Sequence, residues 1–483
     1  SYSSLREINN LLLQSFGRPL DSVRWERIAG TSRWFLDFMA PDGKMVDFGD
    51  SWDKRGWGML DPLYMLLWEE MTGVKPVGTV NVDACTAKEY FANAWFSKGF
   101  DDPWAVQPSM ARDWQGLVAQ CQTVPTGTTK TILFDQAQSG ALRTYRPGST
   151  TLAQQSGLRY QQADQTYLAV SAVPNDFPHR ELDFGALAWS AYGNRLLYDF
   201  GYGEICKSAQ KKPYLIDDNG MQLFDNLALG ANTLVVEDAT RTNYSGGNYN
   251  NAHINSSQIF GERGSIEAMT LNGASGLHLD ARAVYGANDA EFGWLRYFDR
   301  WLLALDDGNY LVMDAFAVKD ERGQANVQEY WHTSADAFAD PNVCSYADET
   351  VVMGLANANQ TLSLQPRCAM LDRYAMSTVS GRIHAASLQA GEFSIDPDII
   401  QYRARTGSIV PRQRARFKPL APVSEDVRVF LLQAAPKADA LAAASMKKVA
   451  CAADSACFDL KIGGLWKRLV LQKTAGRYQP LSL

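Results

Sequence analysis

From about residue 126 to near the C-terminus, short stretches of alternating apolar and polar residues are separated by polar turns. A period of two places every second side chain on the same face, which is typical of β-strands. Between two of these stretches, Asp306-Asp307-Gly308-Asn309 has the composition of a tight hairpin turn. We therefore expect a large antiparallel β-structure, with strands near 129–133, 140–145, 158–162, 166–173, 233–236, 266–271, 277–285, 294–305, 310–318 and 327–333.

The first 125 residues have a different pattern, in which apolar residues recur at helical spacing. Asp61 and Pro62 are typical of a helix N-cap and the first helical position, and Gly73 is typical of a helix end. Near the other end of the chain, the alanine-rich stretch 438–447 predicts a short helix between strands. The sequence thus predicts a helical segment followed by a much longer β-rich part.

Composition limits the classes of function. The 483 residues carry a net charge of −7 and contain no apolar run near the ~20 residues of a membrane helix, so we expect neither a nucleic-acid partner nor a membrane span. The 13 Trp and 20 Tyr suit a carbohydrate-binding cleft, although large β-rich cores also need them. Seven cysteines are too few for a disulfide scaffold at this length, but Cys451 and Cys457 are close enough to bridge a small loop, and Cys344 and Cys368 are a second candidate pair.

The stretch 179–203, HRELDFGALAWSAYGNRLLYDFGYG, predicts an extended segment from 182 onward, a turn at Tyr192-Gly193-Asn194 and a second strand. Its small residues allow another group to approach the backbone closely. Titratable residues lie at both ends of the stretch: His179, Glu181 and Asp183 at its start, and Asp199, which precedes two glycines, near its end. We therefore expect the two ends of this hairpin to border a functional site.

At this point the sequence resembles the heparinase II/III-like polysaccharide lyases. In that family a His-x-His-x-Asp stretch leads through a glycine turn to Leu-Leu-hydrophobic-Asp-x-Gly; here His179 and Asp183 match the first pattern and 196–201 the second. The segment 232–236 resembles the family's His-Asn-Thr-Val segment, and 309–314 and 330–332 resemble later core strands. The resemblance covers most of 35–475 in outline.

The resemblance implies an α+β, multidomain fold. It divides the chain into a partial (α/α) toroid at 1–125, a large antiparallel β-sandwich at 126–385 and a smaller β-rich region at 386–483. A complete toroid needs many more helical hairpins than the first 125 residues can supply. The resemblance therefore implies either a reduced toroid or a second chain or cleaved fragment that completes it.

Two departures from the family pattern concern metal binding. The family's second histidine is Glu181 here, and the histidine before Asn-Thr is Ala231. In metal-binding members these two histidines and the aspartate equivalent to Asp199 are the ligands, so zinc is not supported. A divalent cation such as Ca²⁺ held by oxygens of Glu181, Asp183 and Asp199 stays open, and a structural hydrogen-bonding role is favoured. We therefore expect no firm cofactor.

The activity that the resemblance implies is β-elimination in an acidic, uronic-acid-containing polysaccharide. This reaction needs a group that neutralises the C6 carboxylate, a base for the C5 proton and an acid for the departing O4. The candidate catalytic residues are His179, as acid/base or carboxylate contact, and Tyr202 or Tyr214 as the phenol. The candidate contacts with the anionic polymer are Arg180, Arg195, Trp52 and His253.

Two other classes stay open from the sequence. One is a non-catalytic polysaccharide-binding or assembly protein built on the lyase sandwich, which the replaced histidines and the short helical part favour. The other is a glycoside hydrolase that uses the paired carboxylates of Glu181 and Asp183. The chain begins at Ser1, which is compatible with a processed product, and a polymer-cleaving enzyme is expected to be periplasmic or secreted.

Overall fold

The computed structural model describes most of the β-rich part of the chain. The described residues are Phe38, Ala40, Val46 and Phe48, and the ranges 129–134, 138–145, 154–156, 159–161, 165–174, 182–192, 194–197, 203–205, 228–239, 257–259, 261–305, 308–334, 351–366, 379–396, 400–404, 409–435 and 441–483. The helices expected in 1–125 lie outside these residues and stay a prediction. One described residue of that segment, Phe38, is buried and packs against Phe134 with 5.7 Å between ring centroids.

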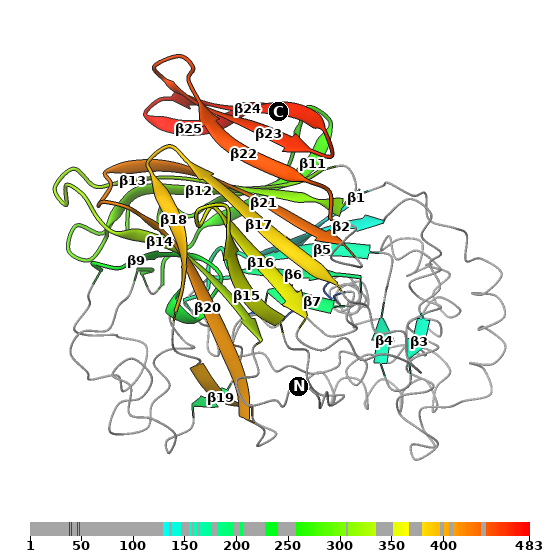
Figure 1. Cartoon of the computed structure of the whole chain (residues 1–483). Helices are drawn as coiled ribbons and strands as arrows, with labels where there is room; N and C mark the ends of the chain where they lie inside the picture. The colour runs from blue at the N-terminus through cyan, green and yellow to red at the C-terminus, as the bar shows by residue number, and fades with distance from the viewer. Residues whose placement is uncertain are drawn as a thin grey trace, which may run out of the picture.

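An eight-stranded antiparallel sheet forms the central layer of the fold (Figure 1). Its strand order is β10-β11-β12-β13-β21-β17-β16-β15, so β21 lies between β13 and β17. Every residue of β13 is buried, as expected of a strand that is covered on both faces. The strands are β10 Ser265–Leu271, β11 Ala274–Asp280, β12 Leu295–Ala304, β13 Tyr310–Val318, β15 Val351–Ala356, β16 Thr361–Pro366, β17 Ser380–Ser387 and β21 Glu425–Ala435.

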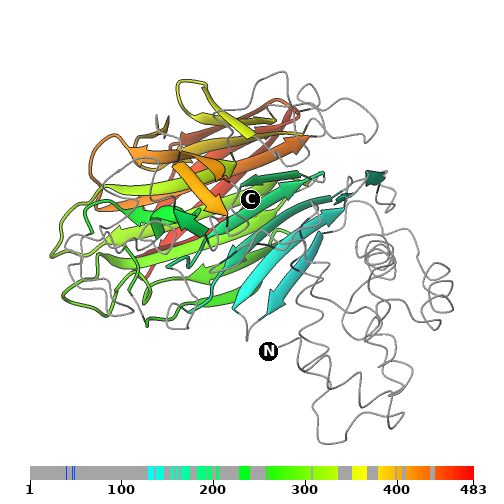
Figure 2. The ribbon, with the colours of Figure 1, turned by 90° about the horizontal axis from the view of Figure 1, so that it is seen from below.

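Two further sheets pack against one face of the central sheet (Figures 1 and 2). The five-stranded sheet has the order β1-β2-β5-β6-β7, and its strands are β1 Thr129–Phe134, β2 Ser139–Tyr145, β5 Gln165–Ser171, β6 Leu187–Ala191 and β7 Asn194–Leu197. The six-stranded sheet has the order β8-β19-β20-β14-β9, with β18 also paired to β20. Its strands are β8 Gly203–Ile205, β9 Leu234–Val236, β14 Val327–Ser334, β18 Gly391–Ile395, β19 Ile400–Ala404 and β20 Ile409–Pro419. A small pair, β3 Gln154–Ser156 and β4 Arg159–Gln161, and a 3₁₀ turn at Ala228–Gly230 complete these elements.

A four-stranded sheet covers the other face of the central sheet. It consists of β22 Ala444–Val449, β23 Ser455–Ile462, β24 Leu465–Thr474 and β25 Arg477–Ser482, and it forms the uppermost layer in Figure 1. Phe458 and Leu471 of this sheet share a core with Trp301 and Met313 of the central sheet. The opposite core, between the central sheet and the two sheets of the other layer, includes Trp189, Leu302, Trp331 and Phe430. Alternation along the central strands therefore supplies both cores.

The predicted strands between 129 and 333 are confirmed, with ends that shift by a few residues in most cases. The predicted hairpin turn before Tyr310 is also confirmed, because β12 and β13 pair antiparallel and Gly308 has a φ of 74°. A disulfide joins Cys451 and Cys457, whose Cα atoms are 6.0 Å apart, as their spacing predicted. The candidate pair Cys344 and Cys368 lies outside the described residues.

Two predictions for the C-terminal part differ from the structure. The boundary expected between 385 and 386 falls inside β17, and β18 to β21 belong to the large sheets; the separate C-terminal sheet begins only at Ala444. The short helix predicted at 438–447 is wrong for its last residues, because β22 begins at Ala444. Pairing of β22 with β23 outweighs the helix propensity of the alanines.

Candidate functional site

The hairpin that the sequence singled out begins with an irregular turn. The amide of Ala186 donates to the carbonyl of Asp183 at 2.8 Å, and Gly185 has a φ of 79°. β6 therefore starts at Leu187 and pairs antiparallel with β7. The hairpin is confirmed, whereas the extended strand expected from residue 182 is wrong, since the chain turns before β6.

Asn232 and Thr233 attach this turn to the neighbouring sheet. The Asn232 side chain donates to the carbonyl of Leu187 at 2.7 Å and accepts from the backbone amide of His332 at 2.6 Å. The Thr233 hydroxyl donates to the carbonyl of Phe184 at 2.9 Å. Both side chains are buried, so these bonds replace strand pairing where the turn interrupts it. Two of the stretches that carry the resemblance, 232–236 and 330–332, are thus in direct contact with each other and with the chain that follows Asp183.

A third polar side chain supports the same turn. Gln258 donates to the carbonyl of Phe184 at 2.9 Å and accepts from the amide of that residue at 3.1 Å. It also donates to the hydroxyl of Tyr285 at 3.1 Å. Burial raises the pKa of Tyr285, which stays a neutral phenol and contacts the carbonyl of Leu234.

Arg300, Asp314 and Glu329 form a buried charged group, here called the Arg300 cluster, beside the turn. Arg300 Nε and Nη2 donate to the two carboxylate oxygens of Asp314 at 2.7 and 2.6 Å, and Nη2 also donates to Glu329 at 2.8 Å. Nη1 donates to the carbonyl of Gly185 and, at 3.4 Å, to that of Asn232. The cluster therefore joins β12, β13 and β14 to the turn, across the interface between two sheets.

The close approach at Gly185 depends on the absence of a side chain. A Cβ atom there would lie 3.2 Å from the Thr233 hydroxyl and 3.7 Å from Arg300 Nη1, and the positive φ is itself unfavourable for other residues. The prediction that the small residues of this segment permit a close backbone contact is confirmed at this position.

The electrostatics of the Arg300 cluster favour one protonation state. All three side chains are at most 1% exposed. Burial, together with the neighbouring carboxylate of Asp314, raises the pKa of Glu329 well above its ordinary value of 4.5. The two carboxylates raise the pKa of Arg300, which stays a cation. A protonated Glu329 leaves Arg300 and Asp314 as a balanced pair inside the core.

A second buried pair lies next to this cluster on the central sheet. Arg428 is the cross-strand neighbour of Asp314, donates to Asp426 at 3.0 Å and donates to the carbonyl of Val327 at 2.6 Å. Burial raises the pKa of Asp426, whereas Arg428 acts in the opposite direction. Because these groups are inaccessible to a polymer, their role is structural, and Arg428 fixes the start of β14 at Val327.

Most of the site residues predicted from the sequence lie outside the described residues. These are His179, Arg180, Glu181, Asp199, Tyr202, Tyr214, Trp52 and His253. Arg195 is described: it lies on β7 and is 1% exposed, so it is a core residue and its role as a substrate contact stays a prediction. Asp183 is 2% exposed within the turn, and His332 is fully buried on β14 as a structural histidine.

Sequence reasoning missed the Arg300 cluster. A signal was present for two of its members, because Arg300 and Asp314 each interrupt a strand whose neighbouring residues are mainly apolar. A charged residue in such a strand needs a buried partner. The pairing of the partners depends on strand order and on the sheet that each strand joins, which the local pattern does not reveal.

The residues present do not fit the metal site of the metal-binding lyases. Ala231, at the position of one ligand histidine, is 1% exposed and offers only a methyl group. Within the described ranges, no group of three or more His, Cys, Asp or Glu side chains is arranged to hold a metal ion. Glu181 and Asp199 lie outside those ranges, so an oxygen-ligated cation stays a prediction.

Comparisons with known proteins relate this chain to others through its fold. No family model and no curated protein sequence matches it. Among solved structures, heparinase III matches with a TM-score of 0.56 and 13% identity over 94% of this chain and 55% of its own. The heparinase III product of BT4657 matches with a TM-score of 0.56 and 10% identity over 93% and 53%. The heparan sulfate lyase HepC from Pedobacter heparinus gives 0.52 and 13% over 90% and 51%.

These similarities show a shared fold. The chain spans about half the length of each of these structures, and the described part is mostly antiparallel β-sheet, as in a β-sandwich. In the same described part, no helix has the length and apolar character that a membrane span requires.

Proposed function

We propose that the protein is a polysaccharide lyase that cleaves an acidic, uronic-acid-containing polysaccharide by β-elimination. The observation that carries this proposal is the fold that nearly the whole chain shares with heparinase III and a heparan sulfate lyase. The packing around Asn232 supports it, because the sequence stretches that resemble the lyase family contact one another there. The shared fold and this packing both support the proposal.

The proposed chemistry divides the tasks of β-elimination among the candidate residues. His179 neutralises the C6 carboxylate or acts as the acid/base, and Tyr202 or Tyr214 exchanges a proton with C5 or O4. Elimination breaks the C5–H and O4–C4 bonds and leaves a C4–C5 double bond, while the proton goes to the enzyme base and the leaving oxygen receives one. In this proposal the turn at 183–186, held by Asn232, Gln258 and Arg300, is the rigid support from which the chain leads back to His179.

The proposed partner is an anionic polysaccharide that contacts Arg180, Trp52 and His253. A second chain or cleaved fragment that completes a helical toroid is proposed as a further partner. A periplasmic or secreted location fits an enzyme whose substrate is a polymer.

The experiment incubates the full chain with alginate, heparan sulfate and uncharged dextran while the ultraviolet absorbance of unsaturated uronides and the number of reducing ends are followed. A lyase raises both signals together with a uronic polymer. His179→Ala is expected to abolish the rise, and His278→Gln, on the far face of the central sheet, is the matched histidine control that keeps it. New reducing ends without absorbance would identify a hydrolase and refute the proposal.

A non-catalytic polysaccharide-binding protein is the second candidate. One observation favours it: Ala231, which the sequence resemblance matches to a ligand histidine of metal-binding lyases, is buried and carries only a methyl group. Binding of uronic polymers with neither absorbance nor new reducing ends would support this alternative.

A further inference from the structure

We infer that the outer face of the C-terminal sheet binds an anionic saccharide chain, with Trp466 as the stacking surface and Lys447 and Lys461 as the cations. This site lies on the layer on the other side of the central sheet from the hairpin β6–β7. The choice of a saccharide as occupant rests on the proposed function, whereas the site itself rests on the following geometry.

The four-stranded sheet is strongly basic in an acidic chain. Residues 444–483 contain seven Lys or Arg and two Asp or Glu, which is a formal charge of +5, although the whole chain carries −7. A local positive charge of this kind attracts a polyanion that the rest of the molecule repels.

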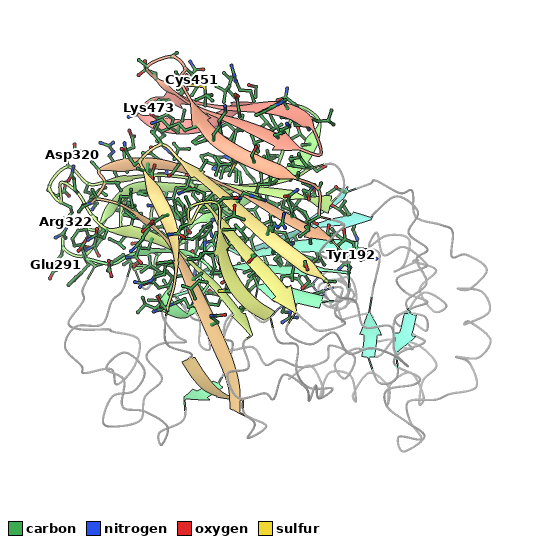
Figure 3. All side chains as sticks on the ribbon, in the orientation of Figure 1. Tyr192, Glu291, Asp320, Arg322, Cys451 and Lys473 are labelled. Carbon is green, nitrogen blue, oxygen red and sulfur yellow. A yellow bond between two sulfur atoms is a disulfide. The ribbon has the colours of Figure 1, made fainter. Side chains whose placement is uncertain are left out.

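The basic residues of this sheet divide between its two faces. On the inner face, Lys473 pairs with Glu425 at 2.7 Å, Lys448 donates to the carbonyl of Leu388 at 2.7 Å, and Arg477 pairs with Asp299. These three contacts attach the C-terminal sheet to the central layer. The labels of Lys473 and Cys451 show the position of the C-terminal sheet in Figure 3. The charges of Lys473, Lys448 and Arg477 therefore serve to attach this sheet to the rest of the fold.

The outer face carries a different set. Strand register forms two neighbouring rows of side chains across β22, β23 and β24. The first row is Ser445–Lys461–Trp466, and the second is Lys447–Asp459–Arg468. Residues alternate with the buried Phe458, Leu460 and Leu469, so both rows face away from the core. Arg468 is paired with Asp459 at 2.6 Å, which leaves the two lysines as the excess charge of these rows.

Trp466 is exposed in the middle of these charges. Its side chain is 55% exposed, and the ammonium groups of Lys461 and Lys447 lie 5.3 and 5.8 Å from the ring centroid. A large exposed aromatic ring on a flat sheet face commonly marks an interaction surface. A pyranose ring can stack on the indole, while its carboxylate or sulfate groups pair with the two ammonium groups.

The arrangement favours a saccharide over two other polyanionic partners. Insertion into a membrane surface requires a continuous apolar face, but Leu465, which is also exposed, lies on the opposite face of β24 from Trp466. Binding of single-stranded nucleic acid usually requires several stacking rings along a basic groove, and these two rows contain one.

The test measures the Kd of the full chain, on ice, for heparin, alginate, dextran, a thymidine oligonucleotide and phosphatidylglycerol vesicles. We expect heparin or alginate to bind and dextran not to bind. Trp466→Ala and the double variant Lys447→Ser/Lys461→Ser should each raise the Kd about tenfold. The double variant should also weaken the dependence of Kd on salt. Leu465→Ala, the adjacent exposed residue on the other face, is the matched control and should change Kd less than about twofold.

The outcomes separate this site from the proposed lyase activity. An unchanged Kd for Trp466→Ala, or binding through Trp466 only to the oligonucleotide or the vesicles, overturns the inference. If unsaturated product forms but Trp466→Ala binds the polymer with an unchanged Kd, this site is refuted and the proposed lyase activity is not affected. Trp466-dependent binding of heparin or alginate without any unsaturated product supports the site and refutes the lyase.

Discussion

Replacement of Arg300 by methionine is expected to destabilise the protein by about 4 kcal/mol. The guanidinium is 1% exposed and bonds to both carboxylate oxygens of Asp314, to Glu329 and to the carbonyls of Gly185 and Asn232. Methionine fills a similar volume but leaves a buried carboxylate without its cation. Removal of one partner of a buried ion pair costs about 3–5 kcal/mol, and the expected loss lies in the middle of this range.

Arg296 provides the matched control on the same strand. It is 48% exposed and pairs at 3.2 Å with Asp320, which is 88% exposed. Arg296→Met should therefore change the free energy of unfolding by less than about 0.5 kcal/mol. Urea denaturation followed by circular dichroism measures both variants, and Arg300→Met should shift the midpoint to a clearly lower concentration with an unchanged slope. Equal stability of the two variants would refute the view that the Arg300 cluster holds the sheets and the turn together.

Three further predictions concern the same structure. Glu329→Gln should gain stability relative to the wild type as pH rises above 4.5, by up to about 1.4 kcal/mol per pH unit. The reason is that Glu329 keeps its proton in the folded wild type and releases it in the unfolded chain. Parallel curves of unfolding free energy against pH for the two proteins would contradict this. Asn232→Ala should cost about 2–4 kcal/mol, since it removes partners from the buried carbonyl of Leu187 and amide of His332, whereas the exposed Gln479→Ala should cost almost nothing in the same denaturation assay. Cys457→Ser should lower stability by about 2 kcal/mol under oxidising conditions and should have no effect in the presence of a reductant; a loss that is equal in both would argue against the disulfide.

The strands were largely predictable because alternation and turn composition are local. The turn before Tyr310 and the disulfide between Cys451 and Cys457 are of this kind. The position of β21 between β13 and β17 was not predictable, because it depends on pairing between segments more than 100 residues apart. For the same reason the boundary near residue 386 was placed too early.

The candidate site was predictable in part. The resemblance singled out Asp183, 232–236 and 330–332, but it did not indicate which of these segments touch; the bonds of Asn232 show that contact. The sequence did not reveal that Asp183 and Arg195 are buried, since a charged residue beside a turn has the same local pattern whether it faces solvent or a core. Burial of such residues is decided by the layer that covers them, which only the assembled sheets define.

Mass spectrometry of the products from a uronic polymer tests the central claim most directly. Elimination yields fragments whose non-reducing ends are one water lighter than the corresponding hydrolysis products, and we expect these with the wild type and not with His179→Ala. Saturated fragments alone, or an intact polymer after prolonged incubation with the folded protein, would contradict the assignment as a polysaccharide lyase.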